Sequence, residues 1–363
     1  MPLKGLEALN QLYSQPEACA PAIGLSHVRD DSPGFSRRRC GKGFVYLSPA
    51  GRRIGEPTLK RRFEQLAIPP AWKQVWISPD ADSHLQATGI DEAGRKQYLY
   101  HPDWQQFRNR LKFYHLIPFA ECLPRLRRKA LQTLRSCPPP SAENVLAAMV
   151  LLLDKGALRI GNEVYYESNE SVGLTTLLPE HVEIAGSHLR LHYTGKAGQE
   201  QNICLNHREL AAVLAVLRTQ GGPRLFCYRS GNGDFCNVSA ETVNQYLQAF
   251  SPCSISAKDF RTWKGTLLAY EQLLLAMRQP EPPPLKAIVE TVATALGNTP
   301  AVAQSSYIHP DLLSLWKAGE FEKYQRQVAA CKPIAYFSRT ENQLLRLLEI
   351  LFRKYMQPEL QAS

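Results

Sequence analysis

The spacing of hydrophobic residues in this chain changes its period near residue 100, and this change constrains the fold most. Residues 34–100 carry short alternating or aromatic runs between turn residues, a pattern typical of β-strands. Examples are 43–47, 74–77 and 97–101. From Pro102 to Arg135 the apolar residues recur at helical spacing. We therefore predict an α+β protein with a small β-rich domain followed by a larger, mainly helical domain.

Proline-rich segments indicate where the domains and helices end. Cys137 and the three prolines after it should stop a helix and form a stiff linker, with Ser141 capping the next helix. The hinge between the domains lies there or about twenty residues earlier. We place a loosely held lead-in at 1–33, the β-rich domain at 34–105 and the mainly helical domain at 106–363.

A second, smaller β region is predicted inside the helical domain. Three short runs of strand character should form a small antiparallel sheet: 182–184, 189–193 and 202–205. The turn at 195–198 contains two glycines and puts Lys196 at or beside a hairpin tip. After Asn206 helical patterns dominate, and the proline-rich run at 280–284 interrupts them.

The positive charge is confined to the front of the chain. Residues 1–140 hold 22 Lys and Arg against 12 Asp and Glu, whereas residues 141–363 hold 21 against 21. A positive front on an electrically balanced body fits a clamp for a polyanion, and double-stranded DNA is the first candidate. The alternative is a solubilising surface.

The cysteine pattern and the hydropathy indicate a soluble cytoplasmic protein, at the nucleoid if DNA is its partner. The nine cysteines are odd in number and form no CxxC pair, which argues against a disulfide framework or a zinc site. The N-terminus lacks the apolar core of a signal peptide. The longest apolar run, 145–153, is too short to cross a bilayer.

The chemistry is suggested by a tyrosine that follows an arginine-containing helical segment. Tyr307 lies in the sequence SSYIHP, and Arg261 lies upstream in KDFRTWKGT. A tyrosine hydroxyl, with a pKa of about 10, is a poor nucleophile unless fixed cations assist it. Arginine supplies a permanently charged fork that matches two phosphate oxygens. The pair therefore suggests phosphoryl transfer to tyrosine.

Three further residues complete a candidate site for attack on a backbone phosphodiester. Arg159 adds a second cation, Lys196 is a mobile donor for the leaving 5′ oxygen, and Asn298 is a neutral hydrogen-bond donor to a phosphate oxygen. A metal would be redundant with these donors, and no carboxylate cluster is present to hold Mg²⁺. We expect no cofactor.

Each of these residues also has a purely structural interpretation. Arg159 can pair with Glu163 on one helix face, and Lys196 can be a solvated hairpin tip. Asn298, after Gly297, can be a plain helix C-cap. The five residues together and in order favour the catalytic interpretation.

The ordered set resembles the active site of type IB DNA topoisomerases, in particular the compact bacterial, poxvirus-like branch. The set is Arg159, Lys196, Arg261, Asn298 and Tyr307. Three stretches of the front domain also resemble that branch: 66–72, 84–89 and 94–101. The viral and nuclear enzymes carry histidine where this chain has Asn298, and asparagine can act there only as a neutral donor.

The resemblance implies an isomerase that relaxes supercoiled DNA without ATP or metal. Tyr307 would attack a phosphodiester to form a 3′-phosphotyrosyl link, and the released 5′-hydroxyl strand would rotate and then reseal the break. Arg159 and Arg261 would hold the phosphate and stabilise the transition state. Lys196 would be the general acid, with Arg159 as a further aid to proton transfer. A monomer with no obligate protein partner is expected.

Six further residues are candidate DNA contacts. The strand around 95–100 carries basic and aromatic side chains, and two of its tyrosines alternate so that they share one face. A basic residue three positions before Arg261 completes the set. The candidates are Arg95, Lys96, Gln97, Tyr98, Tyr100 and Lys258.

Two rival functions follow from the same residues. A tyrosine site-specific recombinase shares the chemistry, but such enzymes usually carry histidine at the position of Lys258. A non-catalytic DNA-binding protein would keep the charge asymmetry without needing Tyr307 and its partners. Relaxation of a plasmid that lacks any special site excludes the first rival, and protein trapped covalently on DNA excludes the second.

Overall fold

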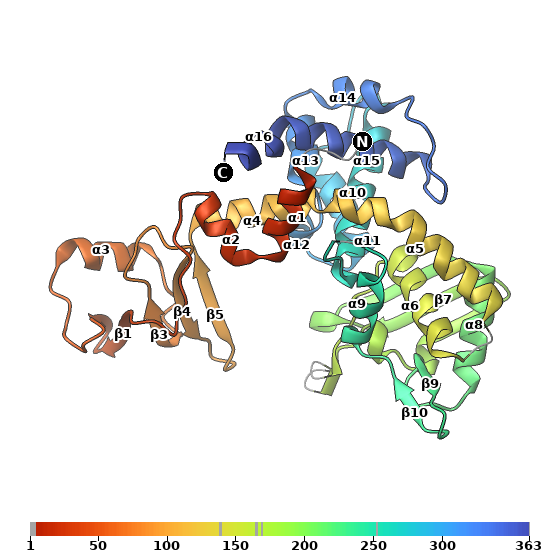
Figure 1. The fold of residues 1–363 in the computed structure, drawn as a ribbon, viewed down its shortest axis with the longest axis horizontal. Helices are drawn as coiled ribbons and strands as arrows, with labels where there is room; N and C mark the ends of the chain where they lie inside the picture. The colour runs from red at the N-terminus through yellow and green to blue at the C-terminus, as the bar shows by residue number, and fades with distance from the viewer. Residues whose placement is uncertain (1–4, 138–139, 164–165, 168–169, 252, 363) are drawn as a thin grey trace. The chain divides into compact units, whose positions relative to one another are not determined.

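The structure is a computed structural model that describes residues 5–137, 140–163, 166–167, 170–251 and 253–362 (Figure 1). It divides into two compact units. The first contains Met1–Tyr114 and Lys354–Ser363, and the second is His115–Arg353. The division falls at the junction of two helices, C-terminal to the limit at 105 that we drew from the sequence. Pro138 and Pro139 of the expected linker lie outside the described residues.

The first unit is built on a five-stranded antiparallel sheet in the order β2-β1-β3-β4-β5. Its strands are β1 (Phe35–Cys40), β2 (Gly43–Leu47), β3 (Lys73–Ile77), β4 (Leu85–Ile90) and β5 (Lys96–Tyr100). Its helices are α1 (Leu6–Ser14), α2 (Pro16–Ala22), α3 (Pro57–Gln65), α4 (Pro102–Tyr114) and α16 (Gln357–Ala362). Phe63 of α3 packs on Val75, Ile77 and Ala87 of the sheet and forms a small core.

The expectation of a loosely held lead-in is wrong. Helices α1 and α2 contact α4, and they bury Leu9 and Cys19 completely. The guanidinium of Arg108 on α4 donates to the carbonyl oxygen of Leu12 at 2.8 Å. A single apolar stripe on a short helix near a chain end gives little periodic signal, although it is enough to dock the helix.

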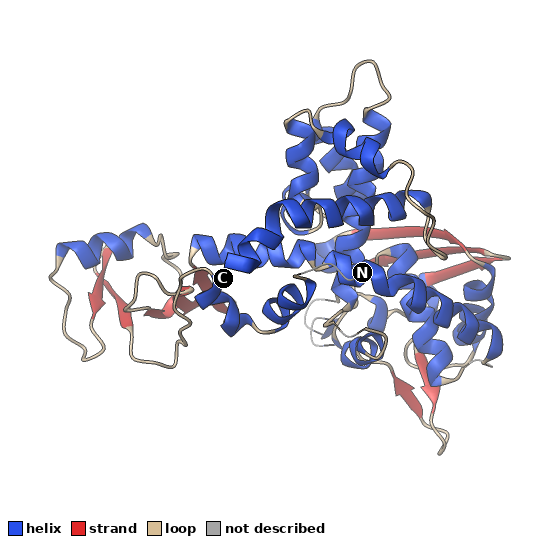
Figure 2. Cartoon of the chain, turned by 45° about the horizontal axis from the view of Figure 1, so that its top comes forward, coloured by secondary structure: helices blue, strands red, loops and turns tan. Residues whose placement is uncertain are grey.

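The second unit is mainly helical with two small antiparallel sheets, as Figure 2 shows. Its helices are α5 (Leu116–Ser136), α6 (Ala142–Gly156), α8 (Arg208–Thr219), α9 (Ala240–Gln248), α10 (Ala257–Ala276), α11 (Leu285–Leu296), α12 (Pro300–Ser306), α13 (Pro310–Lys317), α14 (Phe321–Val328) and α15 (Arg339–Leu351). Its strands are β6 (Val182–Ala185), β7 (His188–Thr194), β8 (Glu200–Asn206), β9 (Cys227–Arg229) and β10 (Phe235–Asn237). Its short helical turns are η1 (Leu174–Thr176), η2 (Pro179–His181) and η3 (Lys196–Gly198). A further turn, η4 (Phe352–Met356), includes the last two residues of this unit and the first three of the C-terminal segment of the first unit.

Most of the local expectations for this unit are confirmed. The side chain of Ser141 caps α6 by accepting from the amide of Asn144 at 3.2 Å. Strands β6, β7 and β8 form the expected antiparallel sheet, with Lys196 in the turn between the last two. The proline-rich run separates α10 from α11. The hairpin of β9 and β10 was not predicted.

Helix α10 is the central element of the second unit, because it packs against α5, α6, α11 and α15. A buried ion-pair cluster braces these helices: Arg127 of α5 bonds the carboxylates of Asp154 and Glu341, each at 2.6 Å. Trp263 of α10 donates to Glu341 at 3.4 Å. The elements that carry the candidate site residues are therefore fixed to one another.

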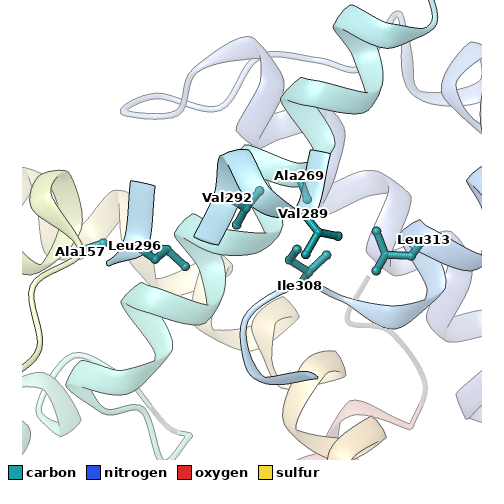
Figure 3. Packing of buried hydrophobic residues seen from close by; sticks show 7 residues of the cluster. All are labelled: Ala157, Ala269, Val289, Val292, Leu296, Ile308 and Leu313. Carbon is teal, nitrogen blue, oxygen red and sulfur yellow. The ribbon is translucent and has the colours of Figure 1, made fainter. Parts of the chain in front are cut away.

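A hydrophobic cluster, drawn in Figure 3, packs against Tyr307 of the candidate site. Its members come from the residue after α6, from α10 and α11, from the connection between α12 and α13, and from α13: Ala157, Ala269, Val289, Val292, Leu296, Ile308 and Leu313. Ala157 precedes Arg159 by two residues, and Ile308 follows Tyr307 directly. Burial of these neighbours fixes the backbone from which the site side chains project.

Among the described residues, the helices are all too short or too polar to span a bilayer.

Candidate active site

Arg261 is a buried cation held by backbone oxygens. It lies on α10, which begins with a capping box between Ser256 and Asp259. Only 4% of the residue is exposed. Its guanidinium donates to the carbonyl of Ala157 and, at 2.8 Å, to that of Leu296, while its buried Nε has no partner among the described residues.

Arg159 lies against the turn between α11 and α12. The chain leaves α6 through Ala157, whose φ of 50° is left-handed, and thereby turns toward the site. The guanidinium of Arg159 donates to the Gly297 carbonyl at 2.8 Å and to Asn298 Oδ1 at 2.6 Å. The alternative pairing with Glu163 is not formed, because that carboxylate bonds Arg224 at 2.8 Å.

The two arginines form an anion-binding arrangement. Within the described residues their hydrogen bonds go to carbonyl oxygens and one amide oxygen, and none goes to a carboxylate. Burial, and then the nearby charge of Arg261, lower the pKa of Arg159 from its ordinary value. A buried guanidinium beside a half-buried one, without a carboxylate partner for either, is costly unless an anion binds between them. A phosphate fits this requirement, since arginine matches its oxygens in pairs.

Tyr307 packs against α10. It ends α12 as the C-cap, and its half-buried ring lies with its centroid 5.0 Å from the guanidinium carbon of Arg261. Thr266 Oγ1 donates to the Tyr307 carbonyl at 3.0 Å and accepts from the amide of His309 at 3.2 Å. A side chain at Gly265 would meet the Tyr307 carbonyl oxygen at 2.7 Å.

Asn298 is bound to Arg159 rather than acting only as a helix cap. Gly297, at a φ of 58°, is the C-cap of α11, and the Asn298 amide donates to the carbonyl of Ala293 at 2.9 Å. The side-chain oxygen is the acceptor for Arg159 described above, and Nδ2 donates weakly to Leu296 at 3.4 Å. The side chain therefore orients one of the two arginines.

Two lysines predicted for the site are exposed. Lys196 lies in η3 at the tip of the β7–β8 hairpin, and Lys258 lies one turn before Arg261 on α10. The structure thus brings Arg159, Arg261, Asn298 and Tyr307 together, and leaves the ammonium of Lys196 in solvent on the hairpin.

Sequence reasoning missed several residues around the site. Gly265 and Thr266 seat the tyrosine, and Gln201 of β8 lies against Gly297. Tyr193 of β7 is buried, which raises its pKa to about 12 although Arg261 and Arg159 oppose the shift. A glycine inside a long helical pattern was a usable signal for close approach.

The candidate DNA contacts of the first unit lie on β5 and the turn before it. Arg95 bonds Asp91 at 2.9 Å, and Lys96 bonds Asp30 at 2.6 Å. Tyr98, which is 45% exposed, stacks on Tyr100 with the ring planes 8° apart. The expectation that these two rings share one face is confirmed.

Gln97 of the same strand is held in the same way, since its amide donates to Asp91 at 2.9 Å. The basic and amide side chains proposed to meet DNA are thus tethered by carboxylates within this unit.

The comparisons with known proteins agree with this chemistry. The family described as "Eukaryotic DNA topoisomerase I, catalytic core" matches residues 101–334, and "Bacterial DNA topoisomerase IB, N-terminal domain" matches residues 43–91. The DNA topoisomerase 1B of Acanthamoeba polyphaga mimivirus is 32% identical over 297 residues, covering 78% of this chain and 88% of the relative.

Two more distant relatives point the same way. The DNA topoisomerase 1B of Vaccinia virus (strain Copenhagen) is 25% identical over 262 residues, covering 69% of this chain and 77% of its own length. The DNA topoisomerase 1 of Mycosarcoma maydis is 24% identical over 195 residues, or 48% of this chain and 19% of its own. Since the catalytic-core family matches well over half of the residues and the mimiviral relative aligns along most of both chains, this chain belongs to the type IB DNA topoisomerases.

Proposed function

We propose that this type IB topoisomerase relaxes supercoiled double-stranded DNA through a covalent intermediate on Tyr307. The observation that carries the assignment is the pair of arginines without carboxylate partners, one of which lies against the ring of that tyrosine. A phosphodiester bound between the guanidiniums would lie next to the phenol. Tyr193, which also lies near both arginines, is buried, whereas Tyr307 is only half-buried.

The chemistry conserves the number of phosphodiester bonds. The Tyr307 hydroxyl oxygen attacks phosphorus and loses its proton, the bond from phosphorus to the 5′ oxygen breaks, and the 5′ oxygen takes up a proton. The phosphate remains linked to the DNA 3′ end through tyrosine. After the free strand has rotated, the 5′-hydroxyl attacks phosphorus and the phenol leaves. Because the bond energy stays in the phosphotyrosine, the cycle requires no ATP.

The surrounding residues have separate roles in this proposal. Arg159 and Arg261 stabilise the charge that builds up on the phosphate oxygens in the transition state, where fixed donors act most strongly. Lys196 protonates the leaving 5′ oxygen, which its place on an exposed hairpin allows it to approach. Asn298 orients Arg159 and can donate its remaining amide hydrogen to a phosphate oxygen.

The first unit and Lys258 supply DNA contacts that do not take part in the chemistry. We assign to this role Arg95, Lys96, Gln97, Tyr98 and Tyr100 of the first unit. We further propose that the enzyme acts as a monomer at the nucleoid, without an obligate protein partner.

Plasmid relaxation in EDTA without ATP tests the proposal, with Tyr307→Phe as the matched variant. The ring stays in place in this variant, and only the nucleophilic oxygen is lost. We expect relaxation and a denaturation-resistant protein–DNA adduct from the parent protein and neither from the variant. Relaxation by the variant would refute Tyr307 as the nucleophile. Activity confined to one special sequence, with strand exchange, would instead indicate a recombinase.

A further inference from the structure

We propose that Gln201 is a positioning residue that docks the Lys196 hairpin onto the turn holding Arg159. This inference rests on the proposed role of Lys196 as general acid. It concerns a residue with no charge and no nucleophilic atom, which lies between the two parts of the site.

The register of the hairpin places Gln201 on the inner side. Thr194 pairs with Glu200 at the end of the ladder, and Tyr193 pairs with Gln201 one step further in. Along β7 buried and exposed residues alternate, and Tyr193 belongs to the buried set. Gln201 is only 8% exposed, whereas Lys196 at the tip is exposed. The polar amide of Gln201 is therefore buried in the hairpin, just below the tip that carries Lys196.

Two glycines make room for this side chain. At Gly297 an added Cβ would lie 2.7 Å from Gln201 Oε1 and 3.0 Å from its Cδ. At Gly195, on the hairpin itself, an added Cβ would lie 3.2 Å from Gln201 Cγ. The glutamine thus occupies the space between the hairpin and the turn that follows α11.

The amide of Gln201 is hydrogen-bonded within the hairpin, and the same amide lies against the turn at Gly297. Nε2 donates to the carbonyls of Gln199 and Glu200, each at 3.3 Å. The turn that it contacts is the one whose Gly297 carbonyl accepts from Arg159 at 2.8 Å. One side chain therefore links the backbone that carries Lys196 to the backbone that fixes Arg159.

This link matters because proton transfer depends steeply on distance. A general acid must come within hydrogen-bond reach of the leaving oxygen, and a displacement of about 1 Å can cost about 100-fold in rate. Without Gln201, the exposed tip of the hairpin, which carries Lys196, would shift while the arginines stayed in place. The loss should therefore fall on leaving-group protonation and not on phosphate binding.

A substrate with sulfur in place of the bridging 5′ oxygen separates these effects. A thiol has a pKa of about 8.5, so a thiolate leaves without being protonated and the general acid becomes dispensable. We expect Gln201→Ala to slow single-turnover cleavage of ordinary duplex DNA by about 10- to 100-fold, with unchanged DNA affinity. On the sulfur substrate the deficit should shrink to within about threefold of the parent protein.

Lys196→Ala and Asn298→Ala calibrate this experiment. The lysine variant should be rescued by sulfur and the asparagine variant should not. If Lys196→Ala is not rescued, the general-acid assignment itself fails. If Lys196→Ala is rescued and Gln201→Ala is not, the positioning role of Gln201 is overturned while the proposed function stands.

Two further variants guard against simple misfolding. Gln201→Met keeps the chain length that fills the space over Gly297, and it should cleave ordinary DNA faster than Gln201→Ala. Gly297→Ala should harm the parent protein more than it harms Gln201→Ala, because its clash partner is then absent. Purely additive losses in this double-mutant cycle, with all variants folded by circular dichroism, would also contradict the proposal.

Discussion

Asn298 differs from the histidine that the resemblance led us to expect of viral and nuclear enzymes, and its contacts explain what an amide can do there. Its Oδ1 accepts from Arg159 at 2.6 Å, so it orients a cation without adding charge. A neutral histidine with a free ring nitrogen could accept in the same way, whereas a protonated one could not. The amide keeps this function at every pH.

The amide can be tested by replacing it with alanine and with aspartate. We expect Asn298→Ala to slow cleavage by about 10-fold, because a hydrogen bond to a charged group is lost. Asn298→Asp should be slower still, since its carboxylate would pair with the arginines in place of the phosphate. The measurement is the single-turnover cleavage rate at saturating protein. A faster cleavage rate for Asn298→Asp than for Asn298→Ala would show that a carboxylate at this position does not compete with the phosphate for the arginines.

His115 makes the stability of the second unit depend on pH. It is completely buried at the start of α5, and its Nε2 donates to the carbonyl of Ser254 at 3.0 Å. Burial lowers the pKa of His115 from 6.5 to about 4. As the pH falls from about 6.5 to about 4, the unfolded chain takes up a proton that the folded protein excludes. Stability should therefore decline across this window, by on the order of 3 kcal/mol.

Denaturant unfolding at pH 7.5, 5.5 and 4.5 measures this decline. His115→Gln is the matched variant, because its side-chain amide can donate to Ser254 but does not titrate. We expect the difference in unfolding free energy between the parent protein and the variant to shift in favour of the variant as the pH falls. A difference that stays constant from pH 7.5 to 4.5 would show that His115 does not control the acid sensitivity.

Among the elements, α10 combines two roles. It carries Arg261 toward the site, and through Gly265 and Thr266 it holds the backbone of Tyr307. The same helix therefore positions both the cation and the nucleophile. A rigid element of this kind positions a site more accurately than a loop does.

We expect Thr266→Val to reduce the cleavage rate by about 10-fold or more, because the Tyr307 carbonyl and the His309 amide lose their partner in a buried place. Thr266→Ser keeps the hydroxyl and should stay close to the parent rate. Gly265→Ala should slow cleavage strongly, since the added carbon overlaps Tyr307. Equal cleavage rates for the valine and serine variants would show that the Thr266 hydroxyl does not position Tyr307.

The sequence was sufficient for elements with clear periodicity and for reactive groups with distinctive chemistry. Strand β7 alternates strictly between buried and exposed residues, and β6 to β8 were predicted to within a few residues. Helix α3 was not predicted, because it lies between segments with strand patterns. Strands β9 and β10 were not predicted either, because they have only three residues each. The role of Gln201 could not be predicted from the sequence, because it arises from contact with Gly297, which is about a hundred residues away along the chain.

At the scale of the whole molecule, the excess of positive charge lies in residues 1–140, yet the candidate DNA-binding cations there are already paired. Asp91 bonds both Arg95 and Gln97, and Asp30 bonds Lys96. Phosphates must displace these carboxylates before the cations can bind DNA. In the free protein these cations are thereby already occupied, which limits non-specific binding.

Removing either carboxylate should tighten DNA binding. We expect Asp91→Asn and Asp30→Asn, each made in the Tyr307→Phe background, to raise duplex affinity by about two- to fivefold. Glu92→Gln removes the same charge from an exposed neighbour for which no ion pair is found among the described residues, so it measures the general effect of charge.

Salt titration then separates a freed cation from a general change in charge. If Arg95 or Lys96 gains a phosphate, the plot of log affinity against log salt should steepen by up to about one unit for the aspartate variants and not for Glu92→Gln. Similar slopes and similar gains for all three variants would mean that the carboxylates act only through net charge. The tethered cations would then have no specific part in holding DNA.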